Sequence, residues 1–319
     1  MSVQRRQLIA ALFLAASAPV WAQPNTTRIV VSFTAGGPVD AVGRAIAEQL
    51  GKELGRTVVI DNKPGANGAI GAGDVMRSPP DGNTLWLTSV GAAAINTSLY
   101  DKLPYDMQRD FAPVSVVVNN VELLVVNPQN PARDAAEFVA ASKKAKQPTA
   151  MASSGIGSIP HLAIEQLIDA SGANLLHVPY KGAAPAITDL MGGQVGGFFG
   201  DVPGLLGHVR SGKLKALGVA SAKRHPALPE VRTLEEQGLK GVDTNNWYAL
   251  FAPAKTPAAT IDRLNKAVRN TLTNPAVRDK LLQSGAEPAP STPQQLAALL
   301  KQDTDKWARL IRAKNIKAE

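Results

Sequence analysis

The sequence lacks cysteine, has few aromatic residues and, beyond its N-terminal segment, contains no apolar run long enough to cross a bilayer. The absence of cysteine excludes disulfides, thiol nucleophiles and thiolate metal sites. Among the 319 residues, 5% are aromatic, 19% charged and 45% hydrophobic, which is typical of a soluble globular protein. This length exceeds the roughly 100–200 residues of one ordinary domain, so we expect two lobes.

Positive charge exceeds negative charge, with 34 Lys and Arg residues against 26 Asp and Glu residues. The basic residues are scattered, so the excess mildly favours small anionic ligands and does not indicate nucleic-acid binding. The four histidines form no H-E-x-x-H motif, and no G-x-S-x-G sequence marks a nucleophile. We therefore expect no catalytic residue, no bound metal and no cofactor.

Residues 1–22 have the pattern of a cleaved secretory signal. Arg5 and Arg6 precede an apolar stretch, and an A-x-A-like cleavage site ends at Ala22. The paired arginines leave both the general secretory route and the twin-arginine route open. Because no cysteine follows the cleavage site, the mature protein carries no lipoprotein-type anchor. We expect it to be free in the periplasm of a Gram-negative bacterium.

Short β-branched segments alternate with helical patterns along the mature chain. The strands that we predict first are Arg28–Phe33, Thr57–Asp61, Thr84–Val90, Val114–Val118 and Glu122–Asn127. Apolar residues at helical spacing indicate amphipathic helices, of which the clearest cover 39–54, 261–272 and 296–311. This alternation predicts an α/β protein with parallel sheets wound by right-handed crossovers.

A strand, a turn of small residues and a helix with proline in its first turn follow one another four times. The prolines are Pro38, Pro160, Pro185 and Pro203. The first turn of a helix leaves backbone N–H groups unpaired, and its dipole adds positive charge there. Because the carboxyl ends of parallel strands meet at one edge, the four turns together predict an anion site in a crevice. Taken singly, each turn is also explained as a good helix start.

Two connections between lobes are expected, near Val114–Asn127 and Leu214–Ser221. We predict that one lobe comprises residues 25–125 with 222–319, and that the other comprises residues 126–221. Two chain crossings of this kind form a hinge.

Several longer motifs resemble the Bug family of extracytoplasmic solute-binding receptors, which serve tripartite tricarboxylate transporters. They are SFTAGGPVDAVGRAIAEQL, DNKPGANGAIGA, SSGIGSIPHLAIEQL, HVPYKGAAPAITDLMGGQV and GKLKALGVAS, and they occur in order over nearly the whole mature chain. The resemblance implies a two-lobed periplasmic binding protein of type II topology, with two mostly parallel sheets joined by a two-strand hinge.

The resemblance also implies a ligand site that uses backbone amides and small hydroxyls from both lobes. In the first lobe it points to Phe33, Thr34, Ala35, Gly36, Gly37 and Asp40. In the second it points to Ser153, Ser154, Gly155, Gly157, Ser158, His161, Tyr180, Lys181, Gly182, Ala184 and Asp201.

Some of these side chains have an equally good structural interpretation. Asp40 and Ser158 stand where a side chain caps a helix, and a direct contact of Asp40 with a carboxylate would be repulsive. Tyr180 fits either the wall of a cleft or a core position with a satisfied hydroxyl. Lys181 is the one cation on these turns, and a solvated lysine is the alternative to a ligand contact.

These observations predict a monomeric binding protein that closes on a small mono-, di- or tricarboxylate and delivers it to membrane permease subunits. The alternative from another class is an extracytoplasmic sensor that partners a membrane kinase. A third hypothesis is a secreted hydrolase, which no catalytic motif in the sequence supports.

Overall fold

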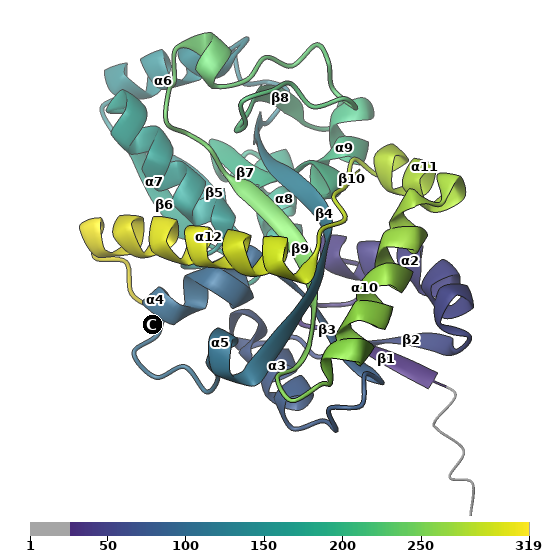
Figure 1. Cartoon of the computed structure of the whole chain (residues 1–319). Coiled ribbons are helices and arrows are strands. Elements are labelled where there is room, and N and C mark those ends of the chain that lie inside the picture. Colours follow the sequence, from purple (N-terminus) through teal and green to yellow (C-terminus); the bar gives the residue numbers. More distant parts are fainter. Residues whose placement is uncertain (1–25, 319) are drawn as a thin grey trace, which may run out of the picture.

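The structure, a computed structural model, describes residues 26–318, so the predicted signal segment lies outside the described residues. Its central feature is a ten-stranded mixed sheet whose main path runs β2-β1-β3-β9-β4-β7-β5-β6, with β8 and β10 both paired to β4 (Figure 1). Helices cover both faces of each half of this sheet, which confirms the predicted α/β class.

The first half of the sheet is built on three parallel strands. These are β1 (Thr26–Val31), β2 (Thr57–Asn62) and β3 (Thr84–Ser89). Helix α2 (Pro38–Leu54) joins β1 to β2, and η1 (Ala66–Gly68) with α3 (Ala69–Met76) joins β2 to β3. The short elements η2 (Gly91–Ile95), α4 (Asn96–Leu99) and α5 (Met107–Asp110) follow. The order β2-β1-β3-β9-β4 is the type II arrangement.

Strand β4 (Phe111–Val126) passes from one half of the sheet to the other. Its residues up to Val121 pair with β9, and from Glu122 onward they pair with β7 and β8. The prediction of two separate strands in this region was wrong. The polar stretch around Asn119 and Asn120 stays extended because β9 pairs with it.

The second half of the sheet has a parallel core of β5 (Thr149–Ser153), β6 (Leu175–Pro179) and β7 (Gly197–Asp201). Strand β8 (Lys215–Val219) pairs with the end of β4. The helices of this half are α6 (Ala135–Lys144), α7 (Ile159–Ser171), α8 (Ala183–Met191) and α9 (Val202–Arg210).

The chain returns to the first half later than the sequence indicated. Residues 222–244, which include η3 (Glu235–Gln237), contribute Leu228 and Leu234 to clusters of the second half. The return is completed by β9 (Asn245–Pro253), which pairs with β3 and β4. The remaining elements are α10 (Ala258–Thr273), α11 (Pro275–Gln283), β10 (Glu287–Pro288) and α12 (Pro293–Ala313).

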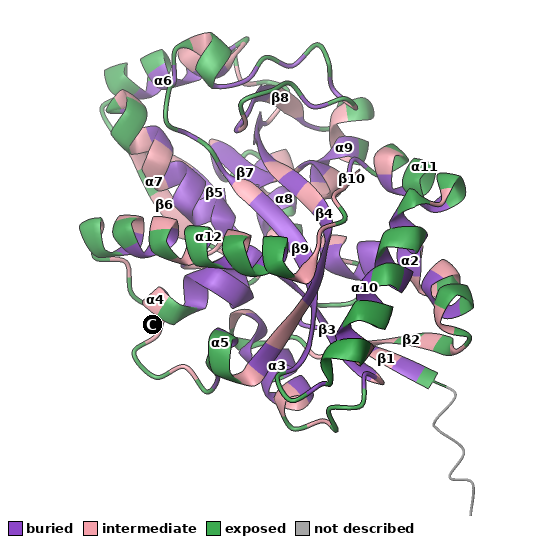
Figure 2. Ribbon diagram, viewed as in Figure 1, coloured by how far each residue is buried: buried purple, intermediate pink, exposed green. Residues whose placement is uncertain are grey.

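The two halves are packed against each other. One apolar cluster joins Trp86 and Trp307 of the first half to Ile159 and Leu162 in the first turns of α7. Figure 2 shows the result, with β4, β7 and β9 mostly buried and the outer faces of α10, α11 and α12 exposed. In residues 26–318, no helix has both the length and the apolar character needed to cross a membrane.

Candidate functional site

The loop after β1, residues 33–40, is called here the first-lobe loop. Gly36 has φ +80°, a left-handed conformation that glycine adopts without strain, and Gly37 is the N-cap of α2 with extended backbone. Pro38 occupies the first turn of the helix, as the sequence predicted. The Gly37 amide donates to the Thr34 carbonyl oxygen at 3.2 Å, which closes the turn.

Asp40 holds this loop together from within. Its side chain is 3% exposed, and it accepts hydrogen bonds from the Gly36 amide at 2.8 Å, Arg44 Nε at 2.9 Å and Asn62 Nδ2 at 3.0 Å. Burial alone would raise the pKa of this carboxyl, but the hydrogen bonds from Arg44, Gly36 and Asn62 together lower it. Asp40 is thus an ionised structural residue of the loop, which is one of the two roles its position allowed.

The loop after β5, residues 153–161, is called here the second-lobe loop, and neutral groups hold it. The Ser153 hydroxyl accepts from the Gly155 amide at 3.1 Å. The Ser158 hydroxyl donates to the Gly155 carbonyl oxygen at 2.7 Å and caps α7 by accepting from the His161 amide. Ser158 therefore has the capping role that its position favoured.

Two histidines support the second-lobe loop from behind. The His161 ring stacks on the ring of His177 with centroids 3.6 Å apart and an angle of 9° between the planes. His161 Nδ1 accepts from the Gly157 amide at 3.0 Å, and His177 Nε2 lies 2.6 Å from the Ser153 hydroxyl oxygen. Burial lowers the pKa of His161 to about 3, with a contribution from His177, and lowers that of His177 to about 4. Both rings are therefore neutral at ordinary pH.

His177 was not among the predicted site residues. It lies on β6, and the pairing of β6 with β5 brings its ring to Ser153 at the start of the second-lobe loop. The sequence signal that could have identified it is its position three residues before Tyr180, at the start of the third predicted turn.

Some backbone amides of these loops are left for a ligand. Within residues 26–318, the amides of Thr34 and Ala35 in the first-lobe loop have no hydrogen-bond partner. The same holds for the amides of Ser154 and Ile156 in the second-lobe loop. Unpaired N–H groups beside the starts of α2 and α7 are suited to an anion, because the helix dipoles add to their positive partial charge.

The loop after β6 carries Tyr180, Lys181, Gly182 and Ala184. The Tyr180 hydroxyl donates to Asp189 Oδ2 at 2.7 Å, so its hydrogen is used within the second lobe. Lys181 is exposed and forms no ion pair with any described residue. Gly182 is the N-cap of α8 with φ +117°. Gly155 lies beside this loop, since a Cβ on it would be 3.3 Å from the Tyr180 carbonyl oxygen.

Asp201 ends β7 and is the N-cap of α9. It accepts a short hydrogen bond from the Tyr248 hydroxyl of β9, so it also links the two halves of the sheet. The starts of α9 and α2 are neighbours, because a Cβ on Gly204 would lie 3.4 Å from both Pro38 Cγ and Asp201 Oδ1. Gly157 of the second-lobe loop in turn rests against Leu99 of α4.

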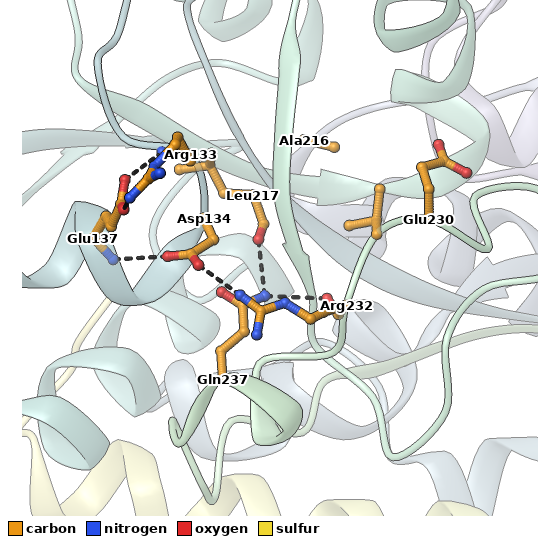
Figure 3. Close-up of a pocket in the computed structure, with 9 residues that line it drawn as sticks. Arg133, Asp134, Glu137, Ala216, Leu217, Glu230, Arg232 and Gln237 are labelled. Atoms are coloured by element: carbon orange, nitrogen blue, oxygen red, sulfur yellow. Dashed lines mark hydrogen bonds and ion pairs between the residues drawn. The ribbon is translucent and has the colours of Figure 1, made fainter.

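The structure thus brings three of the predicted residues together, because Ser153, Gly155 and Tyr180 join the loops after β5 and β6. The predicted residue Asp201 lies at the start of α9, which is beside the start of α2. A separate pocket of about 520 Å³ lies on the second half and contains none of the predicted residues. Figure 3 shows that four of its charged side chains form two pairs, Arg133 with Glu137 and Arg232 with Asp134, whereas Glu230 lies apart from them.

Comparison with known proteins identifies the family. Residues 42–316 match the model of the tripartite tricarboxylate transporter family receptor. The chain is 36% identical to the periplasmic binding protein BugD, with a TM-score of 0.84, coverage of 92% of this chain and 99% of that chain.

Two further similar structures hold ligands. MatC from Rhodopseudomonas palustris, with bound malate, is 32% identical, with a TM-score of 0.82 and coverage of 91% of this chain and 100% of that chain. Rpa4515 of R. palustris, with adipate, is 32% identical, with a TM-score of 0.86 and coverage of 92% of this chain and 98% of that chain. These matches confirm the resemblance drawn from the motifs. The chain belongs to the tripartite tricarboxylate transporter receptor family, whose members include the Bug periplasmic binding proteins.

Proposed function

We propose that this protein captures a small organic carboxylate between its two lobes in the periplasm and delivers it to a membrane permease. The observation that carries this proposal is the set of unpaired amides at Thr34, Ala35, Ser154 and Ile156, which belong to loops at helix starts in both halves. Backbone amides in this setting bind carboxylates well.

The two lobes of the proposal follow the packing of the chain. One comprises residues 26–121 and 245–318, and the other residues 122–244. Strand β4 passes from the first half of the sheet to the second between Val121 and Glu122, and β9 resumes the first half at Asn245. The hinge then consists of the middle of β4 and the segment before β9.

The ligands of similar proteins support a carboxylate as the ligand. The similar structures MatC and Rpa4515 hold malate and adipate, which are both dicarboxylates. A charge-assisted hydrogen bond contributes about 1.5–3 kcal/mol, so a few of them, less the cost of ordering, reach the roughly 8 kcal/mol of micromolar affinity. Because the donors come from both lobes, the bound ligand stabilises the closed form, which a permease can distinguish from the empty one.

Calorimetry of the purified protein against mono-, di- and tricarboxylates, including malate and adipate, tests the proposal. At least one should bind with micromolar or tighter affinity. Gly37→Leu should abolish that binding, because the added Cβ would lie only 3.2 Å from the Thr34 carbonyl oxygen and the side chain would fill the loop.

Gly207→Leu is the matched control, because Gly207 is an exposed residue of α9 with nothing within 4 Å of an added Cβ. It should leave affinity unchanged. A folded protein that binds no member of the panel would overturn the proposal.

A further inference from the structure

Glu122 is a fully buried acid at the point where β4 passes from the first half of the sheet to the second. Its direct neighbour on β7 is Asp201, so two carboxyl groups stand side by side on adjacent strands. Both are tied to β9, since Asn246 Nδ2 donates to Glu122 Oε1 at 3.1 Å and the Tyr248 hydroxyl donates to Asp201. The pair therefore spans the hinge.

No positive charge compensates this pair within residues 26–318, because neither carboxyl forms an ion pair there. The second oxygen of Glu122 has no hydrogen-bond partner among the described residues. A negative charge on the fully buried Glu122, beside a second one on Asp201, would cost more free energy than the neighbouring hydrogen bonds supply. One proton on the pair removes this cost.

We propose that Glu122 is a positioning residue that keeps one proton on the Glu122–Asp201 pair and thereby holds Asp201 in place at the start of α9, so that capture of a carboxylate is linked to protonation at the hinge. This inference rests on the proposed function. Asp201 is the N-cap of α9, and α9 starts beside the first turn of α2. Loss of the proton would add a negative charge next to helix starts that receive an anion.

The electrostatics agree with this geometry. Burial, and then the charge of Asp201, raise the pKa of the Glu122 carboxyl well above its usual range. Burial also raises the pKa of Asp201, although the Tyr248 hydrogen bond opposes it. Burial of Tyr248, and then the charges of Asp201 and Glu122, raise the pKa of its hydroxyl. The hydroxyl therefore keeps its proton and donates it in the hydrogen bond to Asp201.

Other titratable groups on neighbouring elements have interaction partners of their own. On α2, Asp40 is paired with Arg44. Beside β10, His225 Nε2 lies 3.4 Å from Glu287, and burial lowers the pKa of His225. On α12, Asp303 accepts a hydrogen bond from Trp247 Nε1 at 2.6 Å, and burial raises its pKa as well. The titration of the hinge is assigned to the Glu122–Asp201 pair, because these two carboxyls lie side by side where β4 meets β7.

The test is calorimetric binding of malate and of adipate between pH 5.5 and 9, in buffers of different ionisation enthalpy. Affinity of the wild-type protein should fall about threefold to tenfold as pH rises, with proton uptake on binding at the upper end, because a second charge near the anion is repulsive. E122Q should show a flat profile. E287Q is the control, because Glu287 also lies beside β4 but its carboxyl is partly exposed. This variant should keep the pH dependence of affinity seen in the wild-type protein.

Infrared spectroscopy of the unliganded wild-type protein gives a readout that does not depend on the variants. A band from a buried protonated carboxylic acid should be present at pH 7 and should disappear as pH rises; in folded E122Q it should be absent. Binding with a flat wild-type profile, or absence of the band at pH 7, would overturn this inference alone. Failure of every carboxylate to bind at every pH would instead overturn the proposed function.

Discussion

The first-lobe and second-lobe loops have the same local design and opposite electrostatics. Each follows a parallel strand, turns on a glycine with positive φ, and enters a helix with a proline in its first turn. In the first-lobe loop an ionised carboxylate, Asp40, satisfies the Gly36 amide. In the second-lobe loop the neutral groups Ser153 and His161 satisfy the corresponding amides.

This difference bears on how much each loop contributes to the affinity for an anion. A carboxylate inside the first-lobe loop reduces the positive potential at that helix start, although Arg44 offsets part of its charge. The second-lobe loop contains no formal charge, so the potential of α7 is undiminished. We therefore infer that the second-lobe loop makes the larger contribution to anion affinity.

Among the smaller substitutions that compare the two loops, Gly157→Ala should have the largest effect. Gly157 has φ +73°, and an added Cβ would overlap the side chain of Leu99 across the lobe interface. The left-handed conformation costs about 1–2 kcal/mol for alanine, and the overlap with Leu99 adds roughly 1–3 kcal/mol wherever the two lobes make this contact. We expect affinity for malate or adipate to fall more than about tenfold, since about 1.4 kcal/mol corresponds to one decade.

Gly193→Ala is its matched control. Gly193 also has φ +73°, but nothing lies within 4 Å of an added Cβ. It should lower the melting temperature slightly and leave affinity unchanged. Equal losses of affinity in both variants would show that closure against Leu99 does not matter.

The stacked histidines predict acid sensitivity of the second-lobe loop. Since the pKa of His161 is about 3 and that of His177 about 4 in the folded protein, only the unfolded chain gains protons as pH falls below about 6.5. Stability is therefore full above pH 6.5 and is lost as pH falls. Each histidine should contribute a loss on the order of 2 kcal/mol between pH 7 and 5.

Thermal unfolding of the wild-type protein and of His177→Gln over this pH range measures the effect. The variant should lose less stability on acidification, because one of the two stacked histidines no longer gains a proton on unfolding. Parallel stability curves for the two proteins would contradict the assignment.

Asp40→Asn should destabilise the first-lobe loop by about 1–2 kcal/mol at pH 7, because the variant loses charge-assisted bonds. The pKa of Asp40 is lowered in the folded protein, so its contribution is present above the unfolded value near 3.8 and is lost as pH falls. The penalty should therefore shrink on acidification, as measured by denaturant unfolding at pH 7 and pH 3.

Ser158→Ala is the neutral counterpart in the second-lobe loop. Loss of the cap should cost about 1 kcal/mol, with no carboxyl titration behind it. A constant penalty for both variants across pH would show that the two loops do not differ in charge as described.

The fold was largely predictable because its helices are amphipathic. The apolar stripes over 39–54, 261–272 and 296–311 correspond to α2, α10 and α12. The full length of strand β4 was not predictable, because Asn119 and Asn120 interrupt its apolar pattern. Local hydrophobicity also cannot indicate that one strand is shared by both halves of the sheet. The late return of the chain through 222–244 depends on packing of Leu228 and Leu234.

The sequence indicated which loops form the candidate site, but it indicated less well what each side chain contacts there. Helix-capping positions of Asp40 and Ser158 are local features, and both side chains act within one turn of their own helices. The support given by His177 requires a strand pairing, and the partner of Glu122 lies 79 residues away on β7. Which amides remain unpaired likewise depends on the completed fold.

The smallest effect is expected from Lys181, the exposed cation of the loop after β6. An exposed ammonium group is well screened, so Lys181→Gln should weaken binding of malate or adipate only about twofold to fivefold at low salt, and less at 0.15 M salt. Lys143→Gln is the control, because Lys143 is an exposed lysine in the last turn of α6. If Lys181→Gln abolishes binding at any salt concentration, the ligand depends on a side-chain cation, and neutral amides of the second-lobe loop cannot be its main attraction. A small, salt-dependent loss would leave those amides as the dominant source of affinity.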